Sequence, residues 1–253
     1  MGLQMQLLGL AKAVLPPTVR SILRPAVSRI FGLPSRSGKG DADLYVGTDV
    51  VSGQLQFELL KREGCRPSSK VLEVGCGNLN AGIHLIEFLE KDNYVGIDPN
   101  EWLRQVAMKD RDVRRLVQSK GARFLTATDF DASRFGIKFD LVLSHSILSH
   151  CAHWQLELYV NNVAKVLAPK GRIVASIRLA EGNAYGSSGT PDRDDSRNET
   201  WQYPGVSWFK LSTVKETAAR HGLMVSHIPE YTEFYTKTRP NEFHDWLVFS
   251  ASS

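Results

Sequence analysis

The sequence predicts an α/β fold in which helices cover both faces of a mostly parallel β-sheet. Two observations lead to this prediction. A short apolar run stops at two closely spaced glycines, and a second apolar run further along the chain stops at a carboxylate. Strands that are covered on both faces are apolar throughout, and in such doubly wound folds ligands bind outside the carboxyl ends of the strands.

The first strand is predicted at residues 70–74, which read Lys-Val-Leu-Glu-Val. Gly75 and Gly77 follow it, and because they lack a Cβ the backbone can approach a ligand closely. Asn78 and Asn80 are expected to cap the next helix, whose first N–H groups would then point back at that ligand. This turn is the predicted cofactor site.

The second strand is predicted at residues 94–97, and Asp98 ends it. A carboxylate in this place can accept hydrogen bonds from both hydroxyls of a ribose. Two other nucleotide-binding patterns are excluded. The dinucleotide pattern G-x-G-x-x-G requires glycine where Asn80 stands, and no G-x-x-x-x-G-K-S/T phosphate loop occurs. The glycine turn and Asp98 together therefore indicate a nucleotide-like cofactor.

Several motifs resemble those of a known family. Glu73-Val74-Gly75-Cys76-Gly77 followed by Gly96-Ile97-Asp98 resembles the class I S-adenosylmethionine-dependent methyltransferases, whose first motif is E/D-x-G-x-G. Residues 139–146 resemble the fourth strand of that family, and residues 163–173 resemble its next helix, proline turn and fifth strand. The resemblance covers about residues 53–250. It implies a Rossmann-like, doubly wound seven-stranded α/β sheet, mostly parallel with one antiparallel strand, and S-adenosylmethionine as the cofactor.

The resemblance also implies which residues bind the cofactor. Asp129 would accept a hydrogen bond from the exocyclic amine of the adenine and Phe130 would cover the ring, with Thr128 and Asp131 as alternative partners of the amine. The sequence departs from the family at Leu79, where a third glycine is common, so the path of this loop is left open. The implied cofactor-binding residues are Glu73, Gly75, Cys76, Gly77, Asp98, Asp129, Phe130 and Ser144.

Apolar periodicity and turn residues place the remaining elements. Helices are expected at residues 54–61, 81–90, 101–120, 155–167 and 211–221. Strands are expected at residues 123–126, 141–143, 171–177, 224–228 and 246–250. Residues 181–203 form a polar insertion that is long for a plain connection, and we expect it to be a lid. Four aromatic residues could line an acceptor pocket, namely Trp201, Tyr203, Trp208 and Phe209.

Three histidines, His145, His150 and His153, follow the fourth strand. An alcohol or phenol that attacks a methyl group must lose its proton, so a neutral imidazole here is predicted to act as the general base. The catalytic candidates are His145, immediately beyond the strand, and His150, later in the loop. A metal site is disfavoured, because the spacing lacks a clear carboxylate partner. The alternative is that His150 only anchors the following helix.

Residues 1–40 are predicted to form a basic amphipathic arm ahead of a methyltransferase domain at residues 41–253. The arm holds six of the 31 basic residues and no acidic one, and its apolar residues recur at helical spacing after Thr18, a natural N-cap. Three interpretations stay open: peripheral contact with an anionic membrane, a cleaved organellar presequence, or a helix folded over the body. No stretch approaches the length of a membrane span. The remainder has 25 basic and 27 acidic residues, which argues against nucleic acid as a partner.

The composition, with 42% hydrophobic and 23% charged residues, is typical of one soluble globular domain. The three cysteines, Cys65, Cys76 and Cys151, are odd in number and have no C-x-x-C spacing. This disfavours a disulfide framework or a cysteine zinc site and favours a reducing, cytoplasmic compartment. The oligomeric state is left open.

The expected reaction moves the methyl group of S-adenosylmethionine to an oxygen of a small molecule or of a glycan or lipid intermediate. The exit of the fourth strand lacks an Asn-Pro-Pro-Tyr or Asp-Pro-Pro-Tyr segment, which disfavours methylation of the amino group of a nucleic-acid base. Two alternatives stay open: N-methylation of a small molecule, and a protein that binds the cofactor but transfers nothing. The intact cofactor motifs argue against a lost cofactor site.

Overall fold

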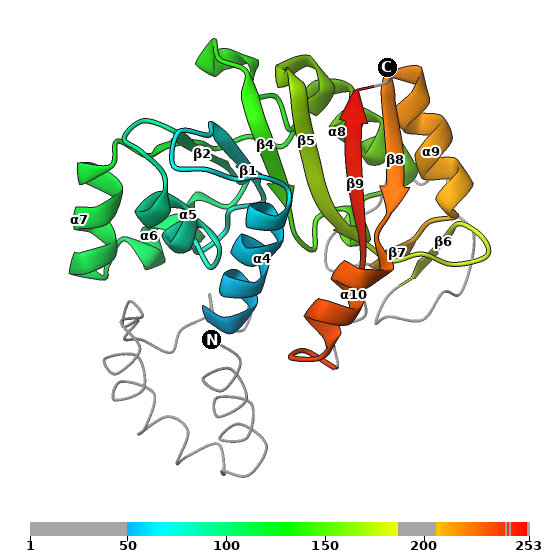
Figure 1. Cartoon of the computed structure of the whole chain (residues 1–253), viewed down its shortest axis with the longest axis horizontal. Helices are drawn as coiled ribbons and strands as arrows, with labels where there is room; N and C mark the ends of the chain where they lie inside the picture. The colour runs from blue at the N-terminus through cyan, green and yellow to red at the C-terminus, as the bar shows by residue number, and fades with distance from the viewer. Residues whose placement is uncertain (1–49, 187–205, 241, 243, 252–253) are drawn as a thin grey trace.

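The computed structural model describes residues 50–186, 206–240, 242 and 244–251 (Figure 1). The predicted arm, residues 1–40, and most of the predicted lid, residues 187–203, lie outside the described residues. The described chain forms a central seven-stranded sheet with helices on both faces, and a separate two-stranded sheet.

The strands of the large sheet are β1 (Val71–Val74), β2 (Tyr94–Ile97), β3 (Arg123–Leu125), β4 (Phe139–Ser144), β5 (Leu167–Ile177), β8 (Leu223–His227) and β9 (Asp245–Ala251), and the small sheet pairs β6 (Ala184–Gly186) with β7 (Val206–Trp208). The order in the large sheet is β3-β2-β1-β4-β5-β9-β8. All neighbours are parallel except that β9 runs antiparallel to both β5 and β8. The predicted fold class is therefore confirmed. The order reverses between β1 and β4, and sheets of this kind bind ligands at such a switch point.

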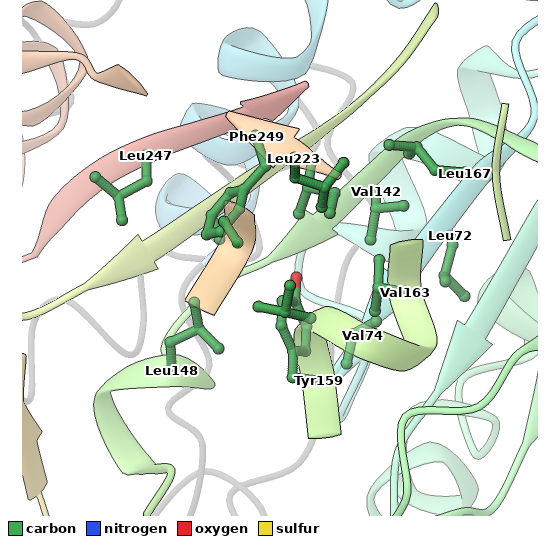
Figure 2. Packing of buried hydrophobic residues seen from close by; sticks show 14 of the residues in the cluster. Leu72, Val74, Val142, Leu148, Tyr159, Val163, Leu167, Leu223, Leu247 and Phe249 are labelled. Carbon is green, nitrogen blue, oxygen red and sulfur yellow. The ribbon is translucent and has the colours of Figure 1, made fainter. Parts of the chain in front are cut away.

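The helices are α4 (Val50–Arg62), α5 (Gly82–Phe88), α6 (Glu101–Ala107), α7 (Arg111–Ser119), α8 (His153–Val166), α9 (Leu211–Arg220) and α10 (Pro229–Thr236). Successive residues of a strand point to opposite faces of the sheet, so a single strand contributes side chains to the hydrophobic core on each face. Leu72 packs in the core formed with α8 and α9, and Val71 packs in the core formed with α4, α5, α7 and α10. Figure 2 shows the first core, where Leu72, Val142 and Val163 gather. None of the helices in the described part of the chain is long and apolar enough to cross a membrane.

The single helix predicted at residues 101–120 is wrong, because the structure has two helices there, α6 and α7. Asp110 separates them. Its Oδ1 accepts hydrogen bonds from the backbone N–H groups of Asp112 at 2.9 Å and Val113 at 3.3 Å, so Asp110 is the N-cap of α7. An aspartate within a predicted long helix can therefore mark the start of a second helix.

Two other local expectations differ from the structure. The predicted caps Asn78 and Asn80 are wrong, because the N-cap of α5 is Ala81 and no side chain caps this helix. Helix α10 is absent from the predicted elements, although Pro229 at its first position and Glu230 in its first turn are typical of a helix start. Helix α10, β6 and β7 lie beyond the carboxyl end of β5 (Figure 1), at the edge where ligands are expected.

Candidate active site

The two glycines turn the chain beside the end of β2. Both have positive backbone angles, with φ of 79° at Gly75 and 45° at Gly77. The N–H of Gly75 donates to the carbonyl oxygen of Ile97 at 2.7 Å. The N–H of Gly77 donates to Oδ2 of Asp98 at 2.9 Å. Hydrogen bonds therefore lock the glycine turn to the predicted ribose-binding carboxylate.

Asp98, the predicted ribose-binding residue, is buried and accepts backbone hydrogen bonds at both carboxylate oxygens. Its Oδ2 accepts from Gly77, and its Oδ1 accepts from the N–H of Asn100 at 2.7 Å. The side chain of Asn100 also hydrogen-bonds to Asp98, so three donors already share the roughly four lone pairs of the carboxylate. Burial raises the pKa of Asp98 above its usual value, against the opposing effect of the two backbone hydrogen bonds. Binding of the ribose hydroxyls of the implied cofactor at Asp98 stays a prediction.

A side chain of the loop after β4 packs directly on Gly75. A Cβ added to this glycine would lie 2.0 Å from Cδ1 of Ile147. The missing Cβ of Gly75 therefore also lets the loop after β4 approach the turn. Ile147, two residues after His145, thus ties the loop that carries the candidate base to the glycine turn.

Leu79 stands where the resembled family commonly has glycine. Its φ of 65° is a left-handed conformation, which glycine adopts without strain. A left-handed residue with a side chain costs about 1–2 kcal/mol. Leu79 is fully buried, and burial of a leucine side chain contributes about 1.5–3 kcal/mol. The packing of Leu79 thus offsets the strain of its backbone.

The carboxyl group of Glu73 is hydrogen-bonded to another side chain of the protein. Its Oε2 accepts a hydrogen bond from the hydroxyl of Tyr94 at 2.6 Å, and both residues are buried. A Cβ on Gly82, in the first turn of α5, would lie 2.7 Å from this hydroxyl and 3.0 Å from Oε2, so the glycine makes room for the pair. Burial raises the pKa of Glu73 to about 8, although the hydrogen bond from Tyr94 opposes the shift. The carboxyl group is therefore mainly protonated at neutral pH.

The Glu73→Gln variant tests this protonation. The folded protein holds the proton of Glu73 up to about pH 8, whereas an unfolded glutamate releases it near pH 4.5. Because the folded state binds the extra proton, the free energy of unfolding should fall as the pH rises between these values, by at most about 1.4 kcal/mol per pH unit. Glu73→Gln should lack this contribution. Urea unfolding of the ligand-free protein at several pH values measures it, with the exposed Glu87→Gln as the control. Parallel pH dependences in wild type and Glu73→Gln would contradict a protonated Glu73.

Three predicted cofactor residues turn their side chains into the protein. Cys76 is buried, and a Cβ on Gly96 would lie 2.8 Å from its Sγ. The ring of Phe130 packs edge-on against Tyr159, with centroids 5.6 Å apart. The hydroxyl of Ser144 hydrogen-bonds to that of Tyr159 at 2.6 Å. Contact between these three residues and the cofactor stays a prediction, and for Ser144 it would involve the backbone.

Asp129 lies half-buried in the loop after β3. Its Oδ2 accepts a hydrogen bond from Nη2 of Arg134 at 3.2 Å, and its Oδ1 accepts from the N–H of Asp131 at 3.2 Å. The contact of Asp129 with an adenine amine also stays a prediction.

A hydrogen-bond chain ends at His145. Its Nε2 lies 3.0 Å from the hydroxyl of Tyr235 on α10. That hydroxyl lies 2.5 Å from Oγ of Ser52 on α4, and Nε2 of Gln56 donates to the same Oγ at 3.0 Å. Two helices from opposite ends of the described chain therefore orient the imidazole.

Aromatic rings enclose His145. Its ring centroid lies 5.1 Å from that of His244, 5.3 Å from that of Tyr235 and 5.6 Å from that of Trp246, on which it stacks at 19°. Burial among these rings, with a smaller effect of His150, lowers the pKa of His145 to about 4. The imidazole is therefore neutral at physiological pH. The influence of His150 also shows that the second candidate base lies near the first.

The sequence motifs missed Ser52, Tyr235 and His244. Each comes from an element far from the fourth strand, so no local pattern connects it with His145. The sequence could have predicted α10 itself. Pro229 is typical of a helix start, and Tyr231 and Tyr235 are four residues apart and so share one helix face. In the structure both tyrosines are buried.

Metal ligands do not gather in the described residues. No group of three or more histidine, cysteine or acidic side chains in this part of the chain could hold a metal ion. The cysteines Cys65, Cys76 and Cys151 are free thiols and all are buried. The third histidine, His153, begins α8.

Residues 72–173 match a family model described as a methyltransferase domain. The matched segment runs from β1 into β5 and so includes the glycine turn, Asp98 and His145. A search of curated proteins finds no match to the chain.

Solved structures of methyltransferases share the fold at low sequence identity. A TehB-like S-adenosylmethionine-dependent methyltransferase from Corynebacterium glutamicum is 18% identical, with 78% of this chain and 88% of that chain covered and a TM-score of 0.52. The magnesium protoporphyrin IX methyltransferase from Synechocystis, solved with bound S-adenosylmethionine, is 16% identical, with 93% and 96% covered and a TM-score of 0.54. An O-methyltransferase family protein from Burkholderia thailandensis is 15% identical, with 84% and 58% covered and a TM-score of 0.56. The predicted resemblance in fold to the S-adenosylmethionine-dependent methyltransferases is confirmed.

Proposed function

We propose that this chain, which carries a methyltransferase domain in the fold of the S-adenosylmethionine-dependent methyltransferases, moves the methyl group of that cofactor to an oxygen atom. The acceptor would be a small molecule or a glycan or lipid intermediate. The observation that supports this most is one junction, where the glycine turn is bonded to Asp98 and a loop with a neutral histidine packs on Gly75. O-methyltransferases are among the proteins with this fold.

The chain's own residues would hold the cofactor and align the reactants. The two oxygens of Asp98 accept the ribose hydroxyls, and the glycine turn brings the backbone close beside them. The bound cofactor supplies an electrophilic methyl group on a sulfonium. Placing an acceptor oxygen in line with that methyl group contributes much of the rate acceleration, because proximity replaces a bimolecular encounter.

His145 would receive the proton of the acceptor. The electron pair of the O–H bond would stay on the oxygen that bonds to the methyl carbon, the pair of the broken carbon–sulfur bond would return to sulfur, and the proton would move to the imidazole. Because Nε2 of His145 faces Tyr235, base action requires that Nε2–H donates to Tyr235 and that Tyr235 donates to Ser52 or Glu242. This order of donors leaves the lone pair of Nδ1 to accept the proton. His150 is the alternative base.

Two other functions remain candidates: N-methylation of a small molecule and binding of the cofactor without transfer. Incubation of the protein with methyl-labelled S-adenosylmethionine and host extract, followed by mass spectrometry of labelled products, separates them. A labelled methyl ether or ester supports the proposal. A labelled amine supports N-methylation, and the absence of any labelled product in the presence of measurable cofactor binding supports a binding protein.

A further inference from the structure

A pocket of about 190 Å³ opens beside the proposed base. Its walls are formed by Arg178, Leu179, Trp208, Thr232, Thr236, His244 and Asp245. Pockets that enclose a whole drug-sized ligand measure roughly 300–1,000 Å³, so this one suits a single part of a larger molecule. The ring of His244 in its wall lies 5.1 Å from that of His145. His244 therefore belongs both to the wall of the pocket and to the surroundings of His145.

Arg178 supplies the positive charge of the pocket. It directly follows β5, and its guanidinium lies over the ring of Trp208, with Cζ 5.6 Å from the ring centroid. Stacking uses the face of the guanidinium and leaves the N–H donors in its plane available. Within the described ranges no carboxylate forms an ion pair with Arg178, and its buried Nε has no hydrogen-bond partner.

The acidic residue in the wall, Asp245, is engaged elsewhere. Its Oδ2 accepts a hydrogen bond from the N–H of Leu179 at 3.0 Å. Its Oδ1 lies 3.2 Å from Nε2 of His227. Asp245 keeps its negative charge while it accepts these contacts, but its oxygens point to Leu179 and His227, and within the described residues it forms no ion pair with Arg178.

Two further side chains in the wall can donate hydrogen bonds. His244 is only 6% exposed, and its Nδ1 has no hydrogen-bond partner among the residues that the structure describes. Oγ1 of Thr232 accepts from the N–H of Trp246 at 3.3 Å, which leaves its own O–H to donate. The hydroxyl of Thr236 is already used as a donor, to the carbonyl oxygen of Thr232 at 2.8 Å. The partly buried guanidinium of Arg178 thus lies near two further donors, His244 and Thr232. A negatively charged hydrogen-bond acceptor would satisfy all three groups.

We propose that this pocket binds a carboxylate or phosphate group of the methyl acceptor. Arg178 would hold the anion through its fork of N–H donors, with Thr232 and His244 completing the contacts, and Trp208 would shield the guanidinium from water. The acceptor is then an anionic molecule that is anchored by its charged end while its hydroxyl lies at His145. This inference rests on the proposed function, because it assigns the pocket to the acceptor of that reaction.

Calorimetric titration with three simple probes tests the pocket without turnover. Benzoate and phenyl phosphate offer the two anions, and benzamide is the neutral counterpart of benzoate. Wild type should bind both anions at one site per chain and benzamide at least tenfold more weakly. The tighter of the two anions identifies the group that the pocket prefers. Arg178→Gln should weaken anion binding at least tenfold, because it loses the charge and the fork, whereas Arg178→Lys should retain part of the affinity.

Arg115→Gln is the matched control, because Arg115 is an exposed arginine on α7 far from the pocket in the chain. It should bind the anions as wild type does. No saturable anion binding by wild type, equal binding of benzoate and benzamide, or unchanged affinity in Arg178→Gln would each overturn the proposal. If Arg178→Gln does not fold, as judged by its circular dichroism, unchanged affinity in Arg178→Lys and in Trp208→Leu overturns it instead. A parallel titration with S-adenosylmethionine separates the two failures. A protein that binds the cofactor but not the anions refutes the pocket alone. A protein that binds the anions through Arg178 but not the cofactor refutes the methyltransferase function and the assignment of the anion to a methyl acceptor, while the anion site itself stands.

Discussion

His145→Asn is expected to transfer methyl groups about 10²–10⁴-fold more slowly than wild type, the usual contribution of a general base. Asparagine can still bond to Tyr235, so the change mainly removes the proton-accepting nitrogen. Single-turnover rates with saturating cofactor and an identified acceptor measure the chemical step alone. His153→Asn, at the start of α8, is the matched control and should keep the wild-type rate. If His145→Asn and His150→Asn both keep it too, no histidine base acts at this strand exit.

The pH profile of the same rates tests whether a base with the lowered pKa of His145 acts. A general base acts when it is deprotonated, so the rate rises with pH through its pKa. With a pKa of about 4, His145 is deprotonated above about pH 5, and the rate should be flat from there to about pH 8. A base with the ordinary histidine pKa of about 6.5 would instead give a midpoint near that pH. Tyr235→Phe should lower the rate and leave cofactor affinity unchanged, because Tyr235 only orients the imidazole.

Asp98→Ala is expected to weaken binding of S-adenosylmethionine by about 10- to 150-fold. Hydrogen bonds to a charged group are worth about 1.5–3 kcal/mol, and each 1.4 kcal/mol is a factor of ten in affinity. The variant also leaves the N–H groups of Gly77 and Asn100 without their acceptor, so the glycine turn should loosen. Asp98→Asn keeps one acceptor oxygen and should lose less affinity than Asp98→Ala.

Isothermal titration calorimetry measures these affinities. Asp112→Ala removes a carboxylate from the exposed surface of α7 and is the matched control for a change in net charge. Melting temperatures show whether each variant is folded at the temperature of the titration. Unchanged affinity in a folded Asp98→Ala protein would show that the ribose does not bind at Asp98.

The elements around the cofactor turn could be predicted because their signals are local. An apolar run that ends at Gly75 and another that ends at Asp98 place β1 and β2 correctly. Their register, with Val71 beside Tyr94, brings the two ends together, so the hydrogen bond between Gly77 and Asp98 follows from the parallel pairing. The glycine turn and the carboxylate are therefore predictable as a unit.

The surroundings of His145 could not be predicted, because they come from distant parts of the chain. Tyr235 and Ser52 meet at its ring although neither is near it in the sequence. The need for glycine at position 75 arises partly from Ile147, whose side chain packs on Gly75 because the loop after β4 folds back on the turn. The helix caps were predicted wrongly for a related reason. Asn and Asp side chains favour helix starts in general, and only the packing determines that Asp110 caps a helix and Asn80 does not.

Titration of the wild-type protein with S-adenosylmethionine tests most directly the claim that the β1–β4 switch point is a methyl-donor site. We expect one saturable site per chain, competition by S-adenosylhomocysteine, and no binding of NAD at the same concentrations, because the glycine pattern of dinucleotide sites is missing at Asn80. The absence of a saturable site for S-adenosylmethionine, or binding of NAD with equal affinity, would contradict the claim.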